Sequence, residues 1–125
     1  MTAHDYYMIQ IAILLNLKHF ICEFILQTSE ISKSKAKYLG GVWHSAHHAI
    51  GSFIVMVFFI SPQFSALLAF FDLIIHYHID WVKMRFGPTS TEDKRYWQWL
   101  GADQFLHHLT YAGMIMLVIL SQQTP

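Results

Sequence analysis

The sequence predicts an all-α fold, an up-down bundle of four helices that spans a membrane. Of the 125 residues, 54% are hydrophobic and only 13% are charged, whereas charged residues make up about 25% of an ordinary soluble domain. Four consecutive apolar stretches are each long enough to cross about 30 Å of hydrocarbon at about 1.5 Å of rise per residue. We therefore expect residues 1–125 to form a single four-span domain. The alternative is a soluble all-helical protein with a very apolar core.

Turn signals separate the four predicted spans. Ser61-Pro62-Gln63 predicts a tight turn, since proline cannot continue a helix, so the second and third spans form a hairpin. Gly87-Pro88 ends the third span, and Ser90 has the spacing of a capping box with Asp93, so the fourth span can begin early as an interfacial turn. The predicted spans are residues 7–27, 42–60, 64–83 and 100–120.

Charge predicts the orientation of these spans. Seven of the eight lysines and arginines lie in or beside the loops after the first and third spans. The positive-inside rule places both loops in the cytoplasm and both termini outside it. The formal net charge of zero gives no basic field for nucleic acid, so none is expected as a partner. The single cysteine, Cys22, excludes an intramolecular disulfide.

Nine histidines are unexpected, because ionisable side chains are costly within a membrane and usually mark function there. At helical spacing, Asn16, His19, Glu23 and Gln27 share one stripe, and Asp72, His76, Asp80 and Lys83 share another. His44 pairs with His47 or His48, and Asp103 pairs with His107, each pair three or four residues apart. The candidate metal ligands are His19, Glu23, His44, His47, His48, His76, Asp80, Asp103 and His107.

These polar positions fall at alternating ends of successive spans, so an up-down bundle brings them together at the cytoplasmic side. Mixed nitrogen and oxygen ligands suit zinc, iron or manganese, and facing helices build di-metal sites in this way. Three buried carboxylates also need neutralisation. Two divalent ions with one hydroxide would supply it, as would one ion with Lys83. A metal-free proton relay, a polar packing network and haem ligation are the alternatives.

Several neighbours of the candidate ligands have secondary roles in this interpretation. The amides of Gln27 and Gln104 could hold a ligating carboxylate or imidazole, or could form hydrogen bonds between helices. Lys35, Lys83 and Arg85 could bind an anionic headgroup or phosphate, or could anchor the protein to the inner leaflet. The histidines expected to lie outside the cluster are His4, His78 and His108.

The order and spacing of these residues resemble a known family. The pattern is His19-x-x-x-Glu23-Phe24-x-x-Gln27, Lys35, His44, His76-x-x-x-Asp80-x-x-Lys83 and Asp103-Gln104-x-x-His107. It resembles the small bacterial and phage membrane proteins catalogued as domain of unknown function 3307, over nearly the whole chain. The family usually has aspartate where this chain has Glu23, so this carboxylate has a longer reach. The resemblance implies a bacterial inner membrane location and leaves the reaction open.

The leading functional hypothesis is a metal-dependent hydrolase that acts on a lipid or a membrane-associated ester or phosphoester. Glu23 or Asp80, when not engaged by metal, would act as general base, and Lys83 would stabilise negative charge. A non-haem di-iron oxidoreductase acting on a lipid chain is the first alternative. A non-enzymatic proton or ion pathway, or a phage membrane effector, is the second. The sequence leaves the oligomeric state open.

Overall fold

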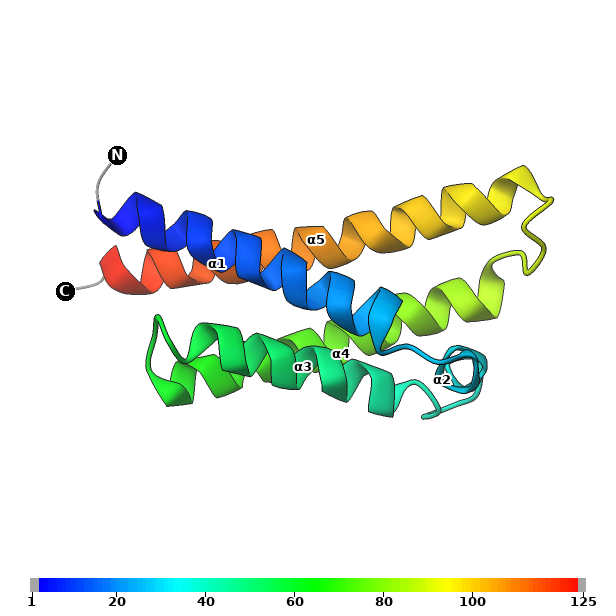
Figure 1. The fold of residues 1–125 in the computed structure, drawn as a ribbon, viewed down its shortest axis with the longest axis horizontal. Coiled ribbons are helices and arrows are strands. Elements are labelled where there is room, and N and C mark those ends of the chain that lie inside the picture. The colour runs from blue at the N-terminus through cyan, green and yellow to red at the C-terminus, as the bar shows by residue number, and fades with distance from the viewer. Residues whose placement is uncertain (1–2, 124–125) are drawn as a thin grey trace.

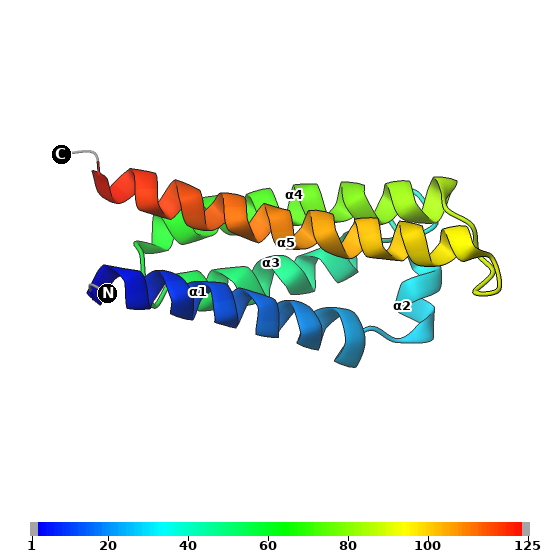
Figure 2. The ribbon, with the colours of Figure 1, turned by 90° about the horizontal axis from the view of Figure 1, so that it is seen from above.

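The computed structural model describes the backbone of residues 3–123 and the side chains of residues 6–122. Its described residues form helices and connecting turns and no strand, which confirms the all-α prediction. Four long helices lie side by side, and a short helix lies across one end (Figure 1, Figure 2). The elements are α1 (Ala3–Phe20), η1 (Ile21–Ile25), α2 (Ser29–Ser34), α3 (Val42–Met56), α4 (Pro62–Phe86) and α5 (Lys94–Gln123).

Three helical segments of the described chain are long and apolar enough to cross a membrane. They are Tyr6–Ile25, Pro62–Phe86 and Lys94–Gln122, with mean hydropathies of 1.6, 1.2 and 1.3. Helix α3 has 15 residues, which at about 1.5 Å per residue is too short for about 30 Å of hydrocarbon. The prediction of membrane-spanning helices thus holds for three of the four long helices.

Helix α3 ends earlier than predicted because the chain reverses before α4. Its last residue is Met56, and the carbonyl of Met56 accepts hydrogen bonds from the amides of Phe59 and Ile60 in the turn that follows. Ser61 is the N-cap of α4, with its Oγ accepting from the amide of Phe64 at 3.4 Å, and Pro62 occupies the first helical position. The predicted hairpin is therefore present, with a longer turn.

The sequence predicted the end of α4 correctly, but the residue that caps the start of α5 differs from the predicted one. Helix α4 ends at Phe86, as Gly87-Pro88 predicts, and the amide of Gly87 donates to the carbonyl of Lys83 at 2.8 Å. Helix α5 begins at Lys94. Asp93 rather than Ser90 caps it, since Asp93 Oδ1 accepts from the amide of Arg95 at 2.9 Å. The predicted early start is thus present, and residues 94–99, which include Trp97 and Trp99, are the first turns of α5 itself.

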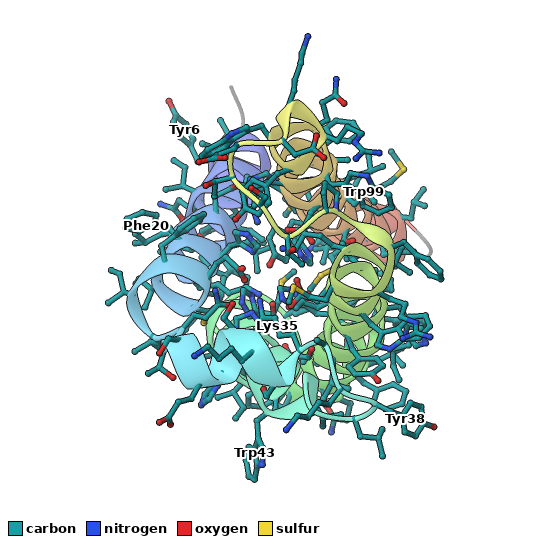
Figure 3. All side chains as sticks on the ribbon, turned by 90° about the vertical axis from the view of Figure 1, so that its right-hand side faces the viewer. Tyr6, Phe20, Lys35, Tyr38, Trp43 and Trp99 are labelled. Carbon is teal, nitrogen blue, oxygen red and sulfur yellow. The ribbon has the colours of Figure 1, made fainter. Side chains whose placement is uncertain are left out.

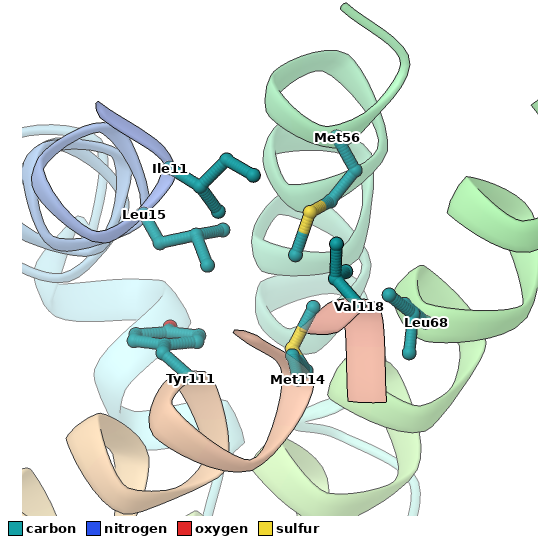
Figure 4. Packing of buried hydrophobic residues seen from close by; sticks show 7 residues of the cluster. All are labelled: Ile11, Leu15, Met56, Leu68, Tyr111, Met114 and Val118. Carbon is teal, nitrogen blue, oxygen red and sulfur yellow. The ribbon is translucent and has the colours of Figure 1, made fainter. Parts of the chain in front are cut away.

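The interior of the molecule is divided along its length. At the end where α1 begins and α5 ends, an apolar core fills the space between the four long helices (Figure 4). Its buried members are Ile11, Leu15, Met56, Leu68, Tyr111, Met114 and Val118. The outward faces of the long helices also carry large apolar side chains such as Phe20, Phe70 and Leu106. The buried charged residues and histidines lie between this core and the end covered by α2.

Candidate metal centre

Seven histidine and acidic side chains of the described chain converge in the polar half of the interior. Helices α3, α4 and α5 each contribute a pair four residues apart, which the helical period places on one face. The η1 turn contributes one carboxylate. Each of the seven is at most 5% exposed, and they are Glu23, His44, His48, His76, Asp80, Asp103 and His107.

Glu23 reaches the interior from a π-helical turn. The amide of Leu26 donates to the carbonyl of Ile21 at 2.9 Å, five residues back, so this turn holds one residue more than an α-helical turn. The predicted stripe along the first span is therefore only partly correct. Glu23 is buried, but Asn16 is exposed, and its side chain donates to the carbonyl of Ala12 at 2.7 Å.

One group of four candidate ligands surrounds a carboxylate oxygen of Glu23. Glu23 Oε2 lies 2.8 Å from the Nε2 of His44, 3.5 Å from the Nε2 of His48 and 3.9 Å from the Nε2 of His76. A tetrahedral ion with bonds of about 2.0–2.2 Å separates its ligand atoms by about 3.4 Å. The four side chains can therefore enclose one ion after small adjustments of their positions.

A second group lies beside the first and shares a residue with it. His76, Asp80 and His107 form this group. Asp80 Oδ2 lies 3.5 Å from His76 Nε2, while Asp80 Oδ1 lies 3.6 Å from His107 Nε2. His107 Nε2 is also 3.6 Å from Asp103 Oδ1. The two oxygens of Asp80 face different histidines, since Oδ2 is also 3.6 Å from His44 Nε2, so this carboxylate lies between the two groups.

Stacked imidazoles connect the helices at this level. The ring centroids of His48 and His76 are 3.7 Å apart, and those of His76 and His107 are 4.0 Å apart, with interplanar angles of 28° and 21°. One ring comes from each of α3, α4 and α5. The stack therefore fixes the relative register of three helices at the candidate site.

Many polar atoms of the cluster have no hydrogen-bond partner among the described residues. They include both ring nitrogens of His48 and of His76, Nε2 of His107, Oδ1 of Asp80 and Oδ1 of Asp103. Leaving one such buried atom unsatisfied costs about 1–3 kcal/mol, and native proteins leave few of them so. Bound cations would satisfy the Nε2 and carboxylate atoms, so these residues fit a metal. The Nδ1 atoms of His48 and His76 lack the carbonyl or carboxylate partner that metal-bound imidazoles usually have.

Lys35 has a role that the sequence prediction did not give it. Its side chain is 2% exposed, and its Nζ lies 3.1 Å from Glu23 Oε1 and 2.9 Å from Asp80 Oδ2. Of its two predicted roles, anchoring to the membrane surface does not fit, since the ammonium group is turned inward, and binding of an anionic group beside the cluster stays a prediction. Lys35 neutralises carboxylates of the cluster from the segment that follows α2.

Two more lysines form buried ion pairs. Lys83 Nζ lies 2.7 Å from Asp103 Oδ2, and Lys18 Nζ lies 2.7 Å from Asp72 Oδ2. Lys18 was missed at the sequence level, although a lysine inside an apolar span is itself a signal of a buried partner. The described interior thus holds three ammonium groups and four carboxylates, those of Glu23, Asp72, Asp80 and Asp103.

This charge count bears on the two metal stoichiometries that the sequence left open. With neutral histidines, three lysines and four carboxylates leave a net charge of −1. One divalent ion with one hydroxide balances that charge, whereas two divalent ions with one hydroxide leave an excess of +2. The charge balance made from the sequence differed because it did not include Lys18, Lys35 and Asp72. The charges therefore favour one ion.

His19 is not positioned as a ligand. Its Nε2 lies 3.0 Å from Oε1 of Gln104, and its Nδ1 lies 2.9 Å from the hydroxyl of Tyr111. Both ring nitrogens are occupied by other side chains, which corrects the prediction that His19 binds metal. Gln104 also donates from Nε2 to Asp103 Oδ2 at 3.0 Å. The amide thus joins α1 to α5 through His19 and also holds Asp103, so its contacts fit both of the roles that the sequence left open.

The remaining histidines with described side chains lie outside the cluster. His48 is buried and its neighbour His47 is exposed, because consecutive helical residues point about 100° apart. The inclusion of His47 among the ligands is corrected accordingly. His78 and His108 are exposed, as expected. The prediction for His4 concerns a side chain outside the described residues.

A cavity of about 360 Å³ lies against the cluster at the end covered by α2. We refer to it as the end cavity. Its polar lining includes Glu23, Gln27, Lys35 and Lys83, and Oε1 of Gln27 is buried there without a hydrogen-bond partner. The view along the bundle from this end shows Lys35 near the middle, with Trp99 on α5 to one side (Figure 3). The apolar part of the lining includes Met84, Pro88, Tyr96, Trp99 and Leu100.

These features define an all-helical protein with helices of membrane-spanning length and a buried cluster of histidines and carboxylates. The chain matches the family described as "Protein of unknown function (DUF3307)" over residues 11–124 and belongs to that family. The resemblance found in the sequence is thereby confirmed. Comparison with curated proteins and with solved structures gives no significant match.

Proposed function

We propose that this protein is a membrane-embedded, metal-dependent hydrolase that cleaves an ester or phosphoester bond of a lipid or membrane-associated substrate. The observation that carries the proposal is the set of unpartnered, buried ligand atoms beside Glu23, a residue that also lines the end cavity. A zinc, iron or manganese ion bound there would lower the pKa of a bound water and polarise the scissile group.

The residues around the first group would have distinct roles in this reaction. Glu23, His44, His48 and His76 would hold the ion. Asp80 lies beside them with its Oδ1 free of hydrogen bonds, in position to accept a proton when it is not itself a ligand. Lys35 and Lys83 line the end cavity, where ammonium groups would stabilise the negative charge of a phosphoester.

The proposed membrane placement has all four long helices in the bilayer as an up-down bundle, with α3 completing it. The end covered by α2 would face the cytoplasm of a bacterium, and both termini would face the other side. Exposed cationic side chains support this orientation, because they lie in or beside the two connections at that end. They are Lys33, Lys37, Arg85, Lys94 and Arg95.

The apolar core favours a site that is closed at one end rather than a proton or ion pathway through the whole bundle. Beyond the ion pair of Lys18 and Asp72, the described interior is filled by apolar side chains such as Met56, Leu68 and Val118 (Figure 4). A conducting pathway needs polar groups or water along its whole length. The polar cavity opens at one end, as a substrate site does.

The test is to purify the protein in detergent without added metal, measure its metal content and absorption spectrum, and assay lipid phosphoester cleavage. Stoichiometric zinc or manganese with turnover supports the proposal, and iron with charge-transfer bands supports an oxidoreductase instead. His48→Ala should lose most bound metal, while the adjacent variant His47→Ala should retain it. Absence of metal from the wild-type protein, or equal metal in both variants, would overturn the assignment.

A further inference from the structure

A second cavity, of about 260 Å³, lies between α4 and α5. We refer to it as the side groove. Its lining consists of His78, Ile79, Val82, Lys83, Trp99, Ala102, Asp103 and Leu106. Val82 and Leu106 are among the exposed apolar side chains, so the groove opens on the outward face of two helices of membrane-spanning length.

The side groove and the end cavity share two residues. Lys83 and Trp99 line both. The carbon stem of Lys83 therefore belongs to a mostly apolar groove, while its ammonium group lies 2.7 Å from Asp103 Oδ2 and 3.8 Å from Asp80 Oδ1. A molecule that occupied both spaces would have an apolar part against α4 and α5 and a polar part beside the candidate metal centre.

The surroundings of the groove indicate what fills it. Apolar cavities exclude water, and a bilayer offers hydrocarbon chains to any apolar groove on a spanning helix. Trp99, at the junction of the two spaces, is the type of side chain that prefers the boundary between hydrocarbon and headgroups. A chain in the groove would thus continue into a headgroup at the level of Lys83.

We infer that the side groove binds one hydrocarbon chain of a lipid whose polar group occupies the end cavity. This inference rests on the proposed function and names its substrate class, a membrane lipid that enters sideways between α4 and α5. The ion pair of Lys83 and Asp103 stands between the chain and the metal centre. The groove thereby selects substrates that carry a long chain.

The test compares two tryptophan substitutions on consecutive residues of α5. Ala102→Trp fills the groove, whereas Gly101→Trp is the matched control, because Gly101 is exposed and a Cβ there meets no atom within 4 Å. Native mass spectrometry of delipidated protein measures binding of palmitoyl lysophosphatidylglycerol. We expect Ala102→Trp to weaken binding by at least about tenfold and Gly101→Trp to bind as the wild type does. Val82→Trp, which fills the groove from α4, should reproduce the loss.

Metal content and turnover separate this inference from the proposed function. In the control Gly101→Trp, metal content and turnover of both compounds should stay at wild-type levels, whereas in Ala102→Trp lipid turnover should fall relative to cleavage of the chainless analogue glycerophosphoglycerol. Unchanged lipid binding in both groove-filling variants would show that the side groove does not bind the hydrocarbon chain, and it would not contradict the proposed hydrolase activity. If the groove-filling variants lose lipid binding but the wild type cleaves neither compound, the hydrolase is refuted and the lipid-binding groove is supported. A wild-type dimer that Ala102→Trp dissociates would refute a lipid occupant and assign the groove to a second copy.

Discussion

Lys35→Met is the substitution whose effect follows most directly from the charge arrangement. It removes the ammonium group that lies 3.1 Å from Glu23 Oε1 and 2.9 Å from Asp80 Oδ2, and it keeps a side chain of similar length. Removing one partner of a buried ion pair costs about 3–5 kcal/mol, a large part of a typical stability of about 5–15 kcal/mol. We therefore expect the metal-free variant to unfold at a much lower temperature than the metal-free wild type.

Metal should reverse this loss. Without Lys35 the buried carboxylates exceed the buried lysines by two, so one divalent ion neutralises them completely. We expect the variant to bind zinc at least about tenfold more tightly than the wild type, a gain of about 1.4 kcal/mol. Thermal unfolding in detergent, measured after chelation and again after titration with zinc, gives both quantities.

The matched control is Lys37→Met, which removes an exposed lysine from the same loop. It should change neither the unfolding temperature nor the zinc affinity. Equal stabilities of the two metal-free variants would show that Lys35 does not neutralise the buried carboxylates. A Lys35→Met protein that zinc fails to stabilise would contradict the assignment of Glu23 and Asp80 to a cation site.

Further predictions concern one helix end and one hydrogen-bonded side chain. In Gly87→Ala the new Cβ would lie 2.6 Å from the carbonyl oxygen of Lys83, so thermal unfolding should show a loss of about 1–3 kcal/mol. Gly101→Ala, in open space, should gain up to about 1 kcal/mol of helix propensity and serves as the control. Tyr111→Phe removes the hydroxyl that lies 2.9 Å from His19 Nδ1 and should cost about 1–3 kcal/mol in the same assay. Metal content should remain unchanged in Tyr111→Phe, and its loss would indicate that His19 binds the ion after all.

The pairs of candidate ligands could be predicted because helical spacing is a local property. His76 with Asp80 and Asp103 with His107 are four residues apart, and each pair shares a face whatever the rest of the chain does. Which faces point inward depends on packing. His47 and His48 fit the spacing equally well from His44, and only the position of α3 against its neighbours decides that His48 is inside.

Other features could not be predicted because they depend on partners distant in sequence. The two hydrogen bonds of His19 come from Gln104 and Tyr111, 85 and 92 residues away. The burial of Lys35 depends on the position of α2 across the end of the bundle, whereas a lysine among other loop lysines usually anchors a membrane surface. The π-helical turn at Glu23 has no recognisable signature in its residue types.

The stack of His48, His76 and His107 also bears on biogenesis. Its rings come from three helices, and Glu23 joins them from a fourth segment near the start of the chain. No pair of neighbouring helices contains the whole set: the four side chains proposed to hold the ion come together once α4 is in place, and His107 completes the stack when α5 packs against it. Metal loading would then report correct assembly of the chain through α4, and a product truncated before α4 would be identifiable by its lack of metal alone.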